Sequence, residues 1–307
     1  MKIGYLGPRG TFTEAALNAM PAASGSEKEP MPSIPDVLDA VRSGNLDAGF
    51  VPVENSHEGT VNVTIDQLLH GDPLLVSAEA VHPVTFVLAS SRPRGEIATV
   101  ASHPHALAQV RQYLRRELPD ADTVEVLSTA AGATAAETGA ADACVCAPHT
   151  AEDHGLPVLD YDIGDNPGAA TRFLLVRRPS APAARTGNDV TSLAVYIRHD
   201  QVGALLNVLT AFSVRGINLT KIESRPTGEG LGRYVFLLDC TGHIEDARVG
   251  DALAALRRSG AGLRFLGSYE RQWIDPPLSP LPGMTDEDYD AAQSWLDALR
   301  RTGESDR

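Results

Sequence analysis

The sequence predicts two α/β lobes in its first 180 residues and a smaller ferredoxin-like domain after them. Up to about residue 180, short apolar strands alternate with helical stretches, which is typical of α/β architecture with mostly parallel sheets. A linker rich in Pro, Ala and polar residues follows at 177–190, and beyond it the order of elements becomes β-α-β-β-α-β. The length of 307 residues agrees with this division, because domains average roughly 150 residues.

The first part opens with a strand at 2–7 and a helix at 11–20, where Thr11 and Glu14 fit a capping box. The expected strands after it are 47–54, 84–90, 99–102, 123–128, 142–148, 156–163 and 171–178. The expected helices between them are 60–69, 104–118, 129–140 and 149–155. This order predicts a two-lobed domain at 1–180 with a periplasmic-binding-protein-like fold. One lobe would hold about 1–77 and 155–180, the other about 80–154, with a ligand cleft between them.

The second part, at 190–272, should form the ferredoxin-like domain. Its strands are expected at 191–199, 217–226, 232–240 and 263–271, and its helices at 202–216 and 245–260. The tail at 273–307 contains a helical stretch at 285–301, in which Ala292, Trp295, Leu296 and Leu299 share one face. We expect this helix to dock on its own protein or to form a frayed acidic end.

Composition excludes several classes of partner. The formal net charge of −14 would repel nucleic acid and anionic lipid, so neither is expected to bind. No apolar run approaches the ~20 residues of a membrane span, and a predicted strand follows Met1 directly, so we expect neither a membrane span nor a signal peptide. Three cysteines, Cys144, Cys146 and Cys240, suggest free thiols in a reducing cytoplasm.

Polar residues follow several strands and could hold an anion. In "LGPRGTFTE", two glycines, Arg9 and the helix start at Thr11 offer charge and free amides, although a simply capped helix explains them as well. In "PVENSHEGTV", a polar cluster follows an apolar strand, at the edge of the sheet where α/β proteins bind ligands. An ordinary polar turn is the alternative.

A third polar stretch is "ASHPHALAQVRQYL". Ser102 is a good helix N-cap, and it should share a helix face with His105 and Gln109. This stripe could bind a carboxylate or could simply face solvent. His103 and His105 lack partners with metal-ligand spacing, so no metal site is expected.

The stretch "DNPGAATRFLLV" places Thr171, Arg172 and Phe173 at the start of an apolar strand. A partly buried guanidinium needs an anion, and its planar fork suits a carboxylate. No Ser-His-Asp arrangement marks Thr171 as a nucleophile, so its hydroxyl is better suited to donating a proton to a departing oxygen. Asp165 is the alternative acid, although an ordinary Asp is ionised at neutral pH.

Taken together and in order, these motifs resemble the prephenate dehydratase family of phenylalanine biosynthesis. The resemblance spans about residues 1–270 and includes "GYLGPRGTFTEAAL", "VPVENSHEGTV", "SHPHALAQ", "DNPGAATRF", "GALL" and "ESRP". It implies that prephenate, which carries two carboxylates and a ring hydroxyl, loses carbon dioxide and water to give phenylpyruvate. Aromatisation would drive the reaction, so no cofactor is expected.

The resemblance also implies roles for single residues. Thr171 would assist the leaving oxygen, Arg172 would bind a carboxylate and Phe173 would pack beside them. The implied substrate-binding residues are Thr11, Glu54, Asn55, Ser56, Ser102 and Gln109. This chain departs from many family members at His105, where they carry Gln.

The C-terminal domain resembles ACT domains, which sense amino acids. The resemblance implies phenylalanine as effector, bound across the interface of a homodimer or homotetramer. The implied binding residues are Gly203, Ala204, Leu205, Leu206, Asn218, Leu219, Glu223, Ser224, Arg225 and Pro226. Two other interpretations stay open at this point, arogenate dehydratase and a two-lobed ligand sensor without chemistry.

Overall fold

The computed structural model describes residues 1–197, 202–228, 230, 233–272 and 279–303. The ends of two expected strands, at 198–199 and 232, and part of the expected tail, at 273–278 and 304–307, lie outside the described residues. The chain divides into two compact units. The first contains Met1–Gln67 and Ala80–Arg178, and the second contains Leu68–Glu79 and Pro179–Arg307.

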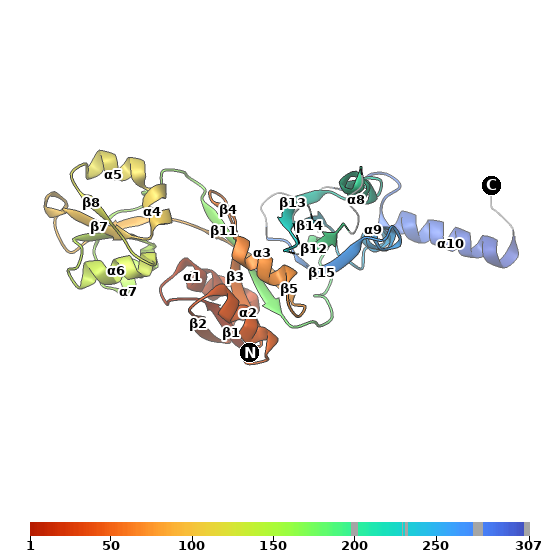
Figure 1. Cartoon of the computed structure of the whole chain (residues 1–307), viewed down its shortest axis with the longest axis horizontal. Helices are drawn as coiled ribbons and strands as arrows, with labels where there is room; N and C mark the ends of the chain where they lie inside the picture. Colours follow the sequence, from red (N-terminus) through yellow and green to blue (C-terminus); the bar gives the residue numbers. More distant parts are fainter. Residues whose placement is uncertain (198–201, 229, 231–232, 273–278, 304–307) are drawn as a thin grey trace. The chain divides into compact units, whose positions relative to one another are not determined.

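The first sheet lies in the N-terminal unit and has the strand order β2-β1-β3-β11-β5, with the short β4 paired to β3 (Figure 1). Its strands are β1 (Lys2–Leu6), β2 (Glu27–Met31), β3 (Ala48–Asn55), β4 (Gly59–Thr60), β5 (Leu75–Pro83) and β11 (Ala170–Arg177). Its helices are α1 (Phe12–Ala19), α2 (Ile34–Arg42) and α3 (Asn62–Leu69), with a 3-10 turn at Pro21–Ala23. Only Ala80–Pro83 of β5 belongs to this unit, as do residues up to Gln67 of α3.

The second sheet, also in the N-terminal unit, has the order β10-β6-β9-β7-β8. Its strands are β6 (Val87–Ala89), β7 (Thr99–Ser102), β8 (Asp122–Glu125), β9 (Ala143–Cys146) and β10 (Val158–Asp160). Its helices are α4 (Pro104–Gln109), α5 (Arg111–Glu117), α6 (Thr129–Glu137) and α7 (Pro148–Asp153), with a 3-10 turn at Arg94–Glu96. Apolar side chains such as Leu88, Val100 and Val145 form its core.

The two-lobed α/β fold is confirmed, but both sheets are mixed rather than mostly parallel. β1 runs parallel to β2 and β3, and β7 runs parallel to β8 and β9. β11, which follows the second lobe in the sequence, pairs antiparallel with β3. In the second sheet β6 and β10 likewise run antiparallel to their neighbours. Strands at the crossings between lobes therefore break the parallel order.

Several local expectations were wrong. Ser102 is the last residue of β7, and His103 is the N-cap of α4. The helix expected at 104–118 is interrupted at Val110, where α4 ends and α5 begins. Thr11 caps α1, but Glu14 accepts from the Gly10 amide at 2.6 Å rather than completing the predicted capping box. β2 and α2 were not predicted at all.

The ferredoxin-like order of the C-terminal module is confirmed. Its elements are β12 (Asp189–Tyr196), α8 (Ala204–Ser213), β13 (Leu219–Pro226), β14 (Tyr234–Thr241), α9 (Ala247–Arg258) and β15 (Gly262–Glu270). The four strands form an antiparallel sheet in the order β13-β14-β12-β15. Phe212, Leu238, Val249 and Leu256 are buried in its core, with α8 and α9 in contact.

The tail forms the expected helix, α10 (Asp286–Thr302), which begins with a capping box between Thr285 and Asp288. Asp286 accepts from the Ala247 amide at 3.1 Å, which fixes the start of the helix to α9. None of its residues is buried, and Trp295 is 51% exposed. The helix is therefore attached to α9 at its first turn, and its side chains are half-buried or exposed. Among the described residues, no helix is both long and apolar enough to cross a membrane.

The 68–79 segment is a feature that the sequence did not suggest. It comprises the end of α3, the turn after it and the first half of β5, and it groups with the C-terminal unit. Leu68, Leu69, Leu74 and Val76 in this segment are all buried. The domain boundaries drawn from the sequence stay a prediction.

Candidate active site

The pairing of β3 with β11 brings two of the predicted polar motifs together (Figure 1). In the antiparallel register, Thr171 lies opposite Asn55 and Arg172 lies opposite Glu54. A register shift between Arg172 and Phe173 then places Phe173 opposite Pro52. Asn55 and Thr171, 116 positions apart in the sequence, therefore become cross-strand neighbours. The side chains of such pairs lie about 5 Å apart.

Asn55 holds the Thr171 hydroxyl. Its Nδ2 donates to Thr171 Oγ1 at 3.0 Å. Its Oδ1 accepts from the backbone amides of His57 at 2.9 Å and Glu58 at 3.2 Å, which fixes the orientation of the side-chain amide. Because Oγ1 accepts from Asn55, the hydroxyl hydrogen of Thr171 is directed to another acceptor. Thr171 is buried, with 9% of the residue exposed.

Arg172 and Phe173 complete the predicted triplet. The Arg172 side chain is 6% exposed, and its Nη1 lies 3.9 Å from Glu54 Oε2. Phe173 is buried and stacks on Phe50, with ring centroids 5.1 Å apart and an interplanar angle of 13°. Phe173 is therefore a core residue that fixes β11 on β3, while Arg172 is a nearly buried cation beside Glu54.

Ser56 ties the loop after β3 to the start of β11. Its amide donates to the Ala170 carbonyl at 2.9 Å, and its Oγ accepts from the Ala170 amide at 3.1 Å. These bonds extend the β ladder by one residue beyond Asn55. Ser56 therefore fixes the backbone next to Thr171.

The turn before α1 meets the second lobe through its neighbours. The Thr11 hydroxyl accepts from the Glu14 amide and donates to the Pro8 carbonyl, as the hydroxyl of a helix cap does. Thr150 Oγ1 donates to the Gly10 carbonyl at 2.6 Å. The Phe12 ring meets Phe86 edge to face at 5.6 Å between centroids. Thr11 thus lies at a contact between the two lobes.

Glu58, which the sequence analysis did not single out, bridges the loop after β3 to α4. Its carboxylate contacts His105 Nδ1 and accepts from Gln109 Nε2 at 3.4 Å. His105 and Gln109 do share one face of α4, as predicted, but Ser102 does not. The position of Glu58 in the polar stretch "ENSHEGT" was the available signal.

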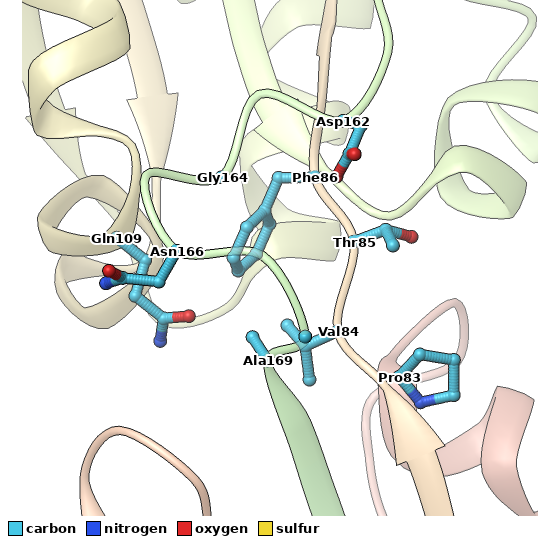
Figure 2. Close-up of a pocket in the computed structure, with 10 residues that line it drawn as sticks. Pro83, Val84, Thr85, Phe86, Gln109, Asp162, Gly164, Asn166 and Ala169 are labelled. Atoms are coloured by element: carbon cyan, nitrogen blue, oxygen red, sulfur yellow. The ribbon is translucent and has the colours of Figure 1, made fainter.

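A pocket lies beside the start of β11, and Figure 2 shows the Gln109 and Asn166 side chains on one side of the Phe86 ring. Its lining comes from the crossing segment after β5, from Gln109 and from the loop before β11: Pro83, Val84, Thr85, Phe86, Gln109, Asp162, Gly164, Asn166, Gly168 and Ala169. Of these, only Gln109 was predicted to bind substrate. Ala169 accepts from the Val84 amide at 2.7 Å and lies two residues before Thr171.

Two predicted candidates are held in structural roles. Ser102 is fully buried, and its hydroxyl donates to the Val145 carbonyl at 2.6 Å. Asp165 accepts from the amides of Gln112 at 2.8 Å and Tyr113 at 3.1 Å, in the first turn of α5. Its carboxylate thus satisfies helix amides that otherwise lack partners, which explains it without proton transfer.

The pKa of His103, the N-cap of α4, is perturbed by its surroundings. Burial lowers the pKa of His103 below its ordinary value of 6.5, and the neighbouring His105 adds to this effect, against the opposing charges of Glu58 and Glu125. Neutral Nδ1 accepts from the His105 amide at 3.2 Å, which caps α4. Among the described residues, no group of three or more His, Cys, Asp or Glu could hold a metal ion.

The predicted effector residues lie on α8 and β13 in the C-terminal module. Gly203 is the N-cap of α8 with a φ of +83°, a left-handed conformation that glycine adopts readily. Leu205 is half-buried next to Ala204, and Leu206 is 65% exposed. Asn218 precedes β13, and Glu223 Oε2 lies 3.7 Å from Lys221 Nζ. The edge strand β13 includes Leu219, Ser224, Arg225 and Pro226.

The fold and the site define a two-lobed α/β domain with a nearly buried arginine in its polar site, joined to a ferredoxin-like module. Models of the prephenate dehydratase family and of the ACT domain match residues 3–181 and 191–258, respectively. The chain belongs to the prephenate dehydratase family. Its reaction is the hydro-lyase reaction of that family, in which prephenate loses carbon dioxide and water to give phenylpyruvate.

Individual relatives agree over nearly the whole chain. A prephenate dehydratase of Amycolatopsis methanolica is 46% identical over 302 residues, covering 98% of each chain. A solved prephenate dehydratase of Arthrobacter aurescens in complex with L-Phe is 43% identical, with a TM-score of 0.90 over 98% of this chain and 100% of the other. A solved quorum-quenching acylase, GqqA, is 26% identical with a TM-score of 0.79 over 89% and 98%. Fold alone therefore does not set the activity.

Proposed function

We propose that Thr171 is the proton donor to the departing hydroxyl of prephenate and that Arg172 binds one of its carboxylates. The observation that carries this proposal is the hydrogen bond from Asn55 to Thr171 Oγ1. A hydroxyl that already accepts a hydrogen bond has its own hydrogen available, and hydrogen bonds in a chain polarise one another. Thr171 then offers a polarised O–H at the start of β11.

The proposed reaction needs neither an oxidant nor a reductant, because carbon dioxide and water leave prephenate with no net gain or loss of electrons. The bond between the ring and its carboxylate breaks, and its electron pair forms the new ring double bond as carbon dioxide leaves. The ring carbon–oxygen bond breaks at the opposite position, and the departing oxygen takes the Thr171 hydrogen to leave as water. Solvent returns a proton to Thr171. Positioned proton transfer of this kind is worth roughly 10²–10⁴-fold in rate.

The residues around Thr171 have positioning roles in this proposal. Glu54 holds the Arg172 guanidinium, Ser56 fixes the adjoining backbone, and Gln109 presents an amide to the pocket. Arg172 gives the site a fixed positive charge, against a chain whose formal net charge is −14. A dianionic substrate therefore meets a local cation in an otherwise repulsive field. Ser102 is proposed only as a structural residue.

The test is turnover by the purified full chain. With prephenate, the absorbance of phenylpyruvate should rise; with arogenate, phenylalanine should form only if the enzyme accepts an amine in place of the keto group. Thr171→Ser should keep much of the rate and Thr171→Ala should nearly abolish it while substrate binding persists. Equal rates for the wild type and Thr171→Ala would contradict the proposed donor.

We further propose that L-phenylalanine binds the C-terminal module and inhibits the enzyme. We also propose that the enzyme is a homodimer or homotetramer. Support comes from the ACT match and from the Arthrobacter aurescens relative, which was solved with L-Phe. The half-buried and exposed residues of α8 and β13 offer an accessible surface for a second subunit.

A cytoplasmic location is proposed from three buried free cysteines, and burial raises the pKa of Cys240 to about 12. Loss of activity on adding L-phenylalanine tests the proposed effector, and sedimentation of the purified chain tests the proposed assembly.

A further inference from the structure

The 68–79 segment is bound to the C-terminal module by charged and polar contacts. Arg264, on β15, donates from Nη1 to the Leu69 carbonyl at 2.7 Å and from Nη2 to the Gly71 carbonyl at 3.0 Å. The Tyr196 hydroxyl, at the end of β12, donates to the same Leu69 carbonyl at 3.1 Å. Leu69 is the last residue of α3, so a cation caps the carbonyl end of this helix, where positive charge is favourable.

The second half of the segment is fixed just as closely. A Cβ placed on Gly267 of β15 would lie only 2.2 Å from the Val76 carbonyl oxygen, so the two backbones are in direct contact. Glu79 is buried, and its Oε1 accepts from the Gln272 amide at 2.8 Å. The segment therefore has little freedom to move independently of β15.

Both ends of this segment continue directly into the candidate active site. Upstream, α3 begins at Asn62, shortly after the loop that follows Asn55 and contains Glu58. Thr64 Oγ1 on α3 donates to the Pro52 carbonyl of β3 at 2.5 Å. Downstream, β5 runs without a break to Pro83, and 83–86 line the pocket. A displacement at either end of the segment is thus carried along a regular helix or strand.

We propose that the 68–79 segment is the mechanical coupler through which the C-terminal module regulates the active site, with Arg264 as its principal attachment. This inference rests on the proposed inhibition by L-phenylalanine and names its structural route. A movement of β15 would shift the end of α3 and the start of β5 together. The shift of α3 would move the polar loop after β3, and the shift of β5 would move the pocket wall at 83–86.

The first experiment measures coupling in the full chain. Arg264→Ala should leave L-phenylalanine binding by calorimetry and the uninhibited kcat and KM within about twofold, while the inhibition factor falls by about tenfold, within the range of allosteric couplings. Tyr196→Phe should act in the same direction with a smaller effect. Arg258→Ala is the matched control, because it removes an exposed cation of α9 that pairs with Asp251. Unchanged inhibition in Arg264→Ala would overturn the proposal.

A second measurement needs no effector. Without L-phenylalanine, amide hydrogen exchange in Arg264→Ala should be faster than in the wild type at 68–86, by about threefold or more, because the attachment of the segment is weakened. Unchanged exchange at these residues would overturn the coupler. If exchange is faster in Arg264→Ala but the wild-type enzyme does not respond to L-phenylalanine, the proposed effector is overturned and the attachment of the segment is not.

Discussion

Asn55 donates to Thr171 Oγ1 across the pair of strands β3 and β11 at 3.0 Å, while two backbone amides hold the other end of its side chain. The direction of this hydrogen bond determines where the threonine hydrogen can go. If the partner were an acceptor instead of a donor, the hydroxyl would turn toward it and would no longer be available to the substrate. Asn55 is thus a positioning residue whose polarity matters as well as its shape.

Asn55→Asp tests this polarity, because the two side chains have nearly the same shape. We expect kcat to fall by roughly 10²-fold or more, as for loss of a positioned proton donor, with a smaller change in KM. Single-turnover rates and KM for prephenate would measure it. Asn18→Asp, at an exposed partner of Lys28, is the matched control and should leave both constants unchanged. A fully active Asn55→Asp enzyme would remove Asn55 from the mechanism.

Arg172→Lys should weaken substrate binding more than it slows the chemical step. A lysine keeps the positive charge but replaces a planar fork with a point charge, so a carboxylate loses one of two parallel hydrogen bonds. We expect KM to rise by about tenfold, equivalent to roughly 1.4 kcal/mol. Steady-state kinetics with prephenate measure this, and an unchanged KM would argue against the assigned contact.

Asp165 provides a test between the two possible acids. As a cap for the amides of Gln112 and Tyr113, it should tolerate replacement by Asn, which also accepts amide hydrogen bonds. We expect Asp165→Asn to keep both activity and stability, and Asp165→Ala to lose about 1 kcal/mol of stability, as for a missing helix cap. Urea unfolding and turnover of both variants decide the matter. An inactive, stably folded Asp165→Asn would favour Asp165 as the acid.

The lowered pKa of His103 predicts a loss of stability in acid. In the unfolded chain His103 takes up a proton as the pH falls through its ordinary value of 6.5, whereas the folded protein binds this proton only at lower pH. The unfolded state therefore binds more protons in this window, and the free energy of unfolding decreases as the pH falls from 6.5 toward the lower folded pKa. His82, whose pKa is also lowered by burial, adds to the effect.

His103→Asn should flatten this pH dependence, because Asn can cap α4 without titrating. Urea unfolding of the wild type and the variant at pH 7.5 and 5.5 measures the difference. His57→Asn, at an exposed position, is the control and should retain the wild-type dependence. An identical loss of stability in wild type and His103→Asn would exclude His103 as a source.

The sequence was sufficient for features that depend on local pattern. Alternation of apolar strands with helices predicted the two lobes, and the β-α-β-β-α-β order predicted the C-terminal module. The polar residues after β3 and before β11 were identified from their position at strand ends. Their direct pairing, Asn55 with Thr171, was not deduced, because strand neighbours distant in sequence are set by the sheet order.

The errors concern partners that are far away in the sequence. Ser102 has the residue type of an N-cap, but the Val145 carbonyl, 43 residues away, takes its hydroxyl inside the sheet. The helix-capping role of Asp165 was not predicted either, because the amides that it accepts from lie 52 and 53 residues before it, in α5. The sequence "EKEPM" did not predict β2, because it is polar and contains a proline. A proline is tolerated at the edge of a sheet, which is the position of this strand.

Because the 68–79 segment groups with Pro179–Arg307, the two units are interleaved along the chain rather than arranged in tandem. A chimaera made by joining two relatives at residue 178 would match β15 from one parent with a helix end and half-strand from the other. Exchanging effector response between relatives would then require a discontinuous graft, in which 68–79 travels together with the C-terminal module.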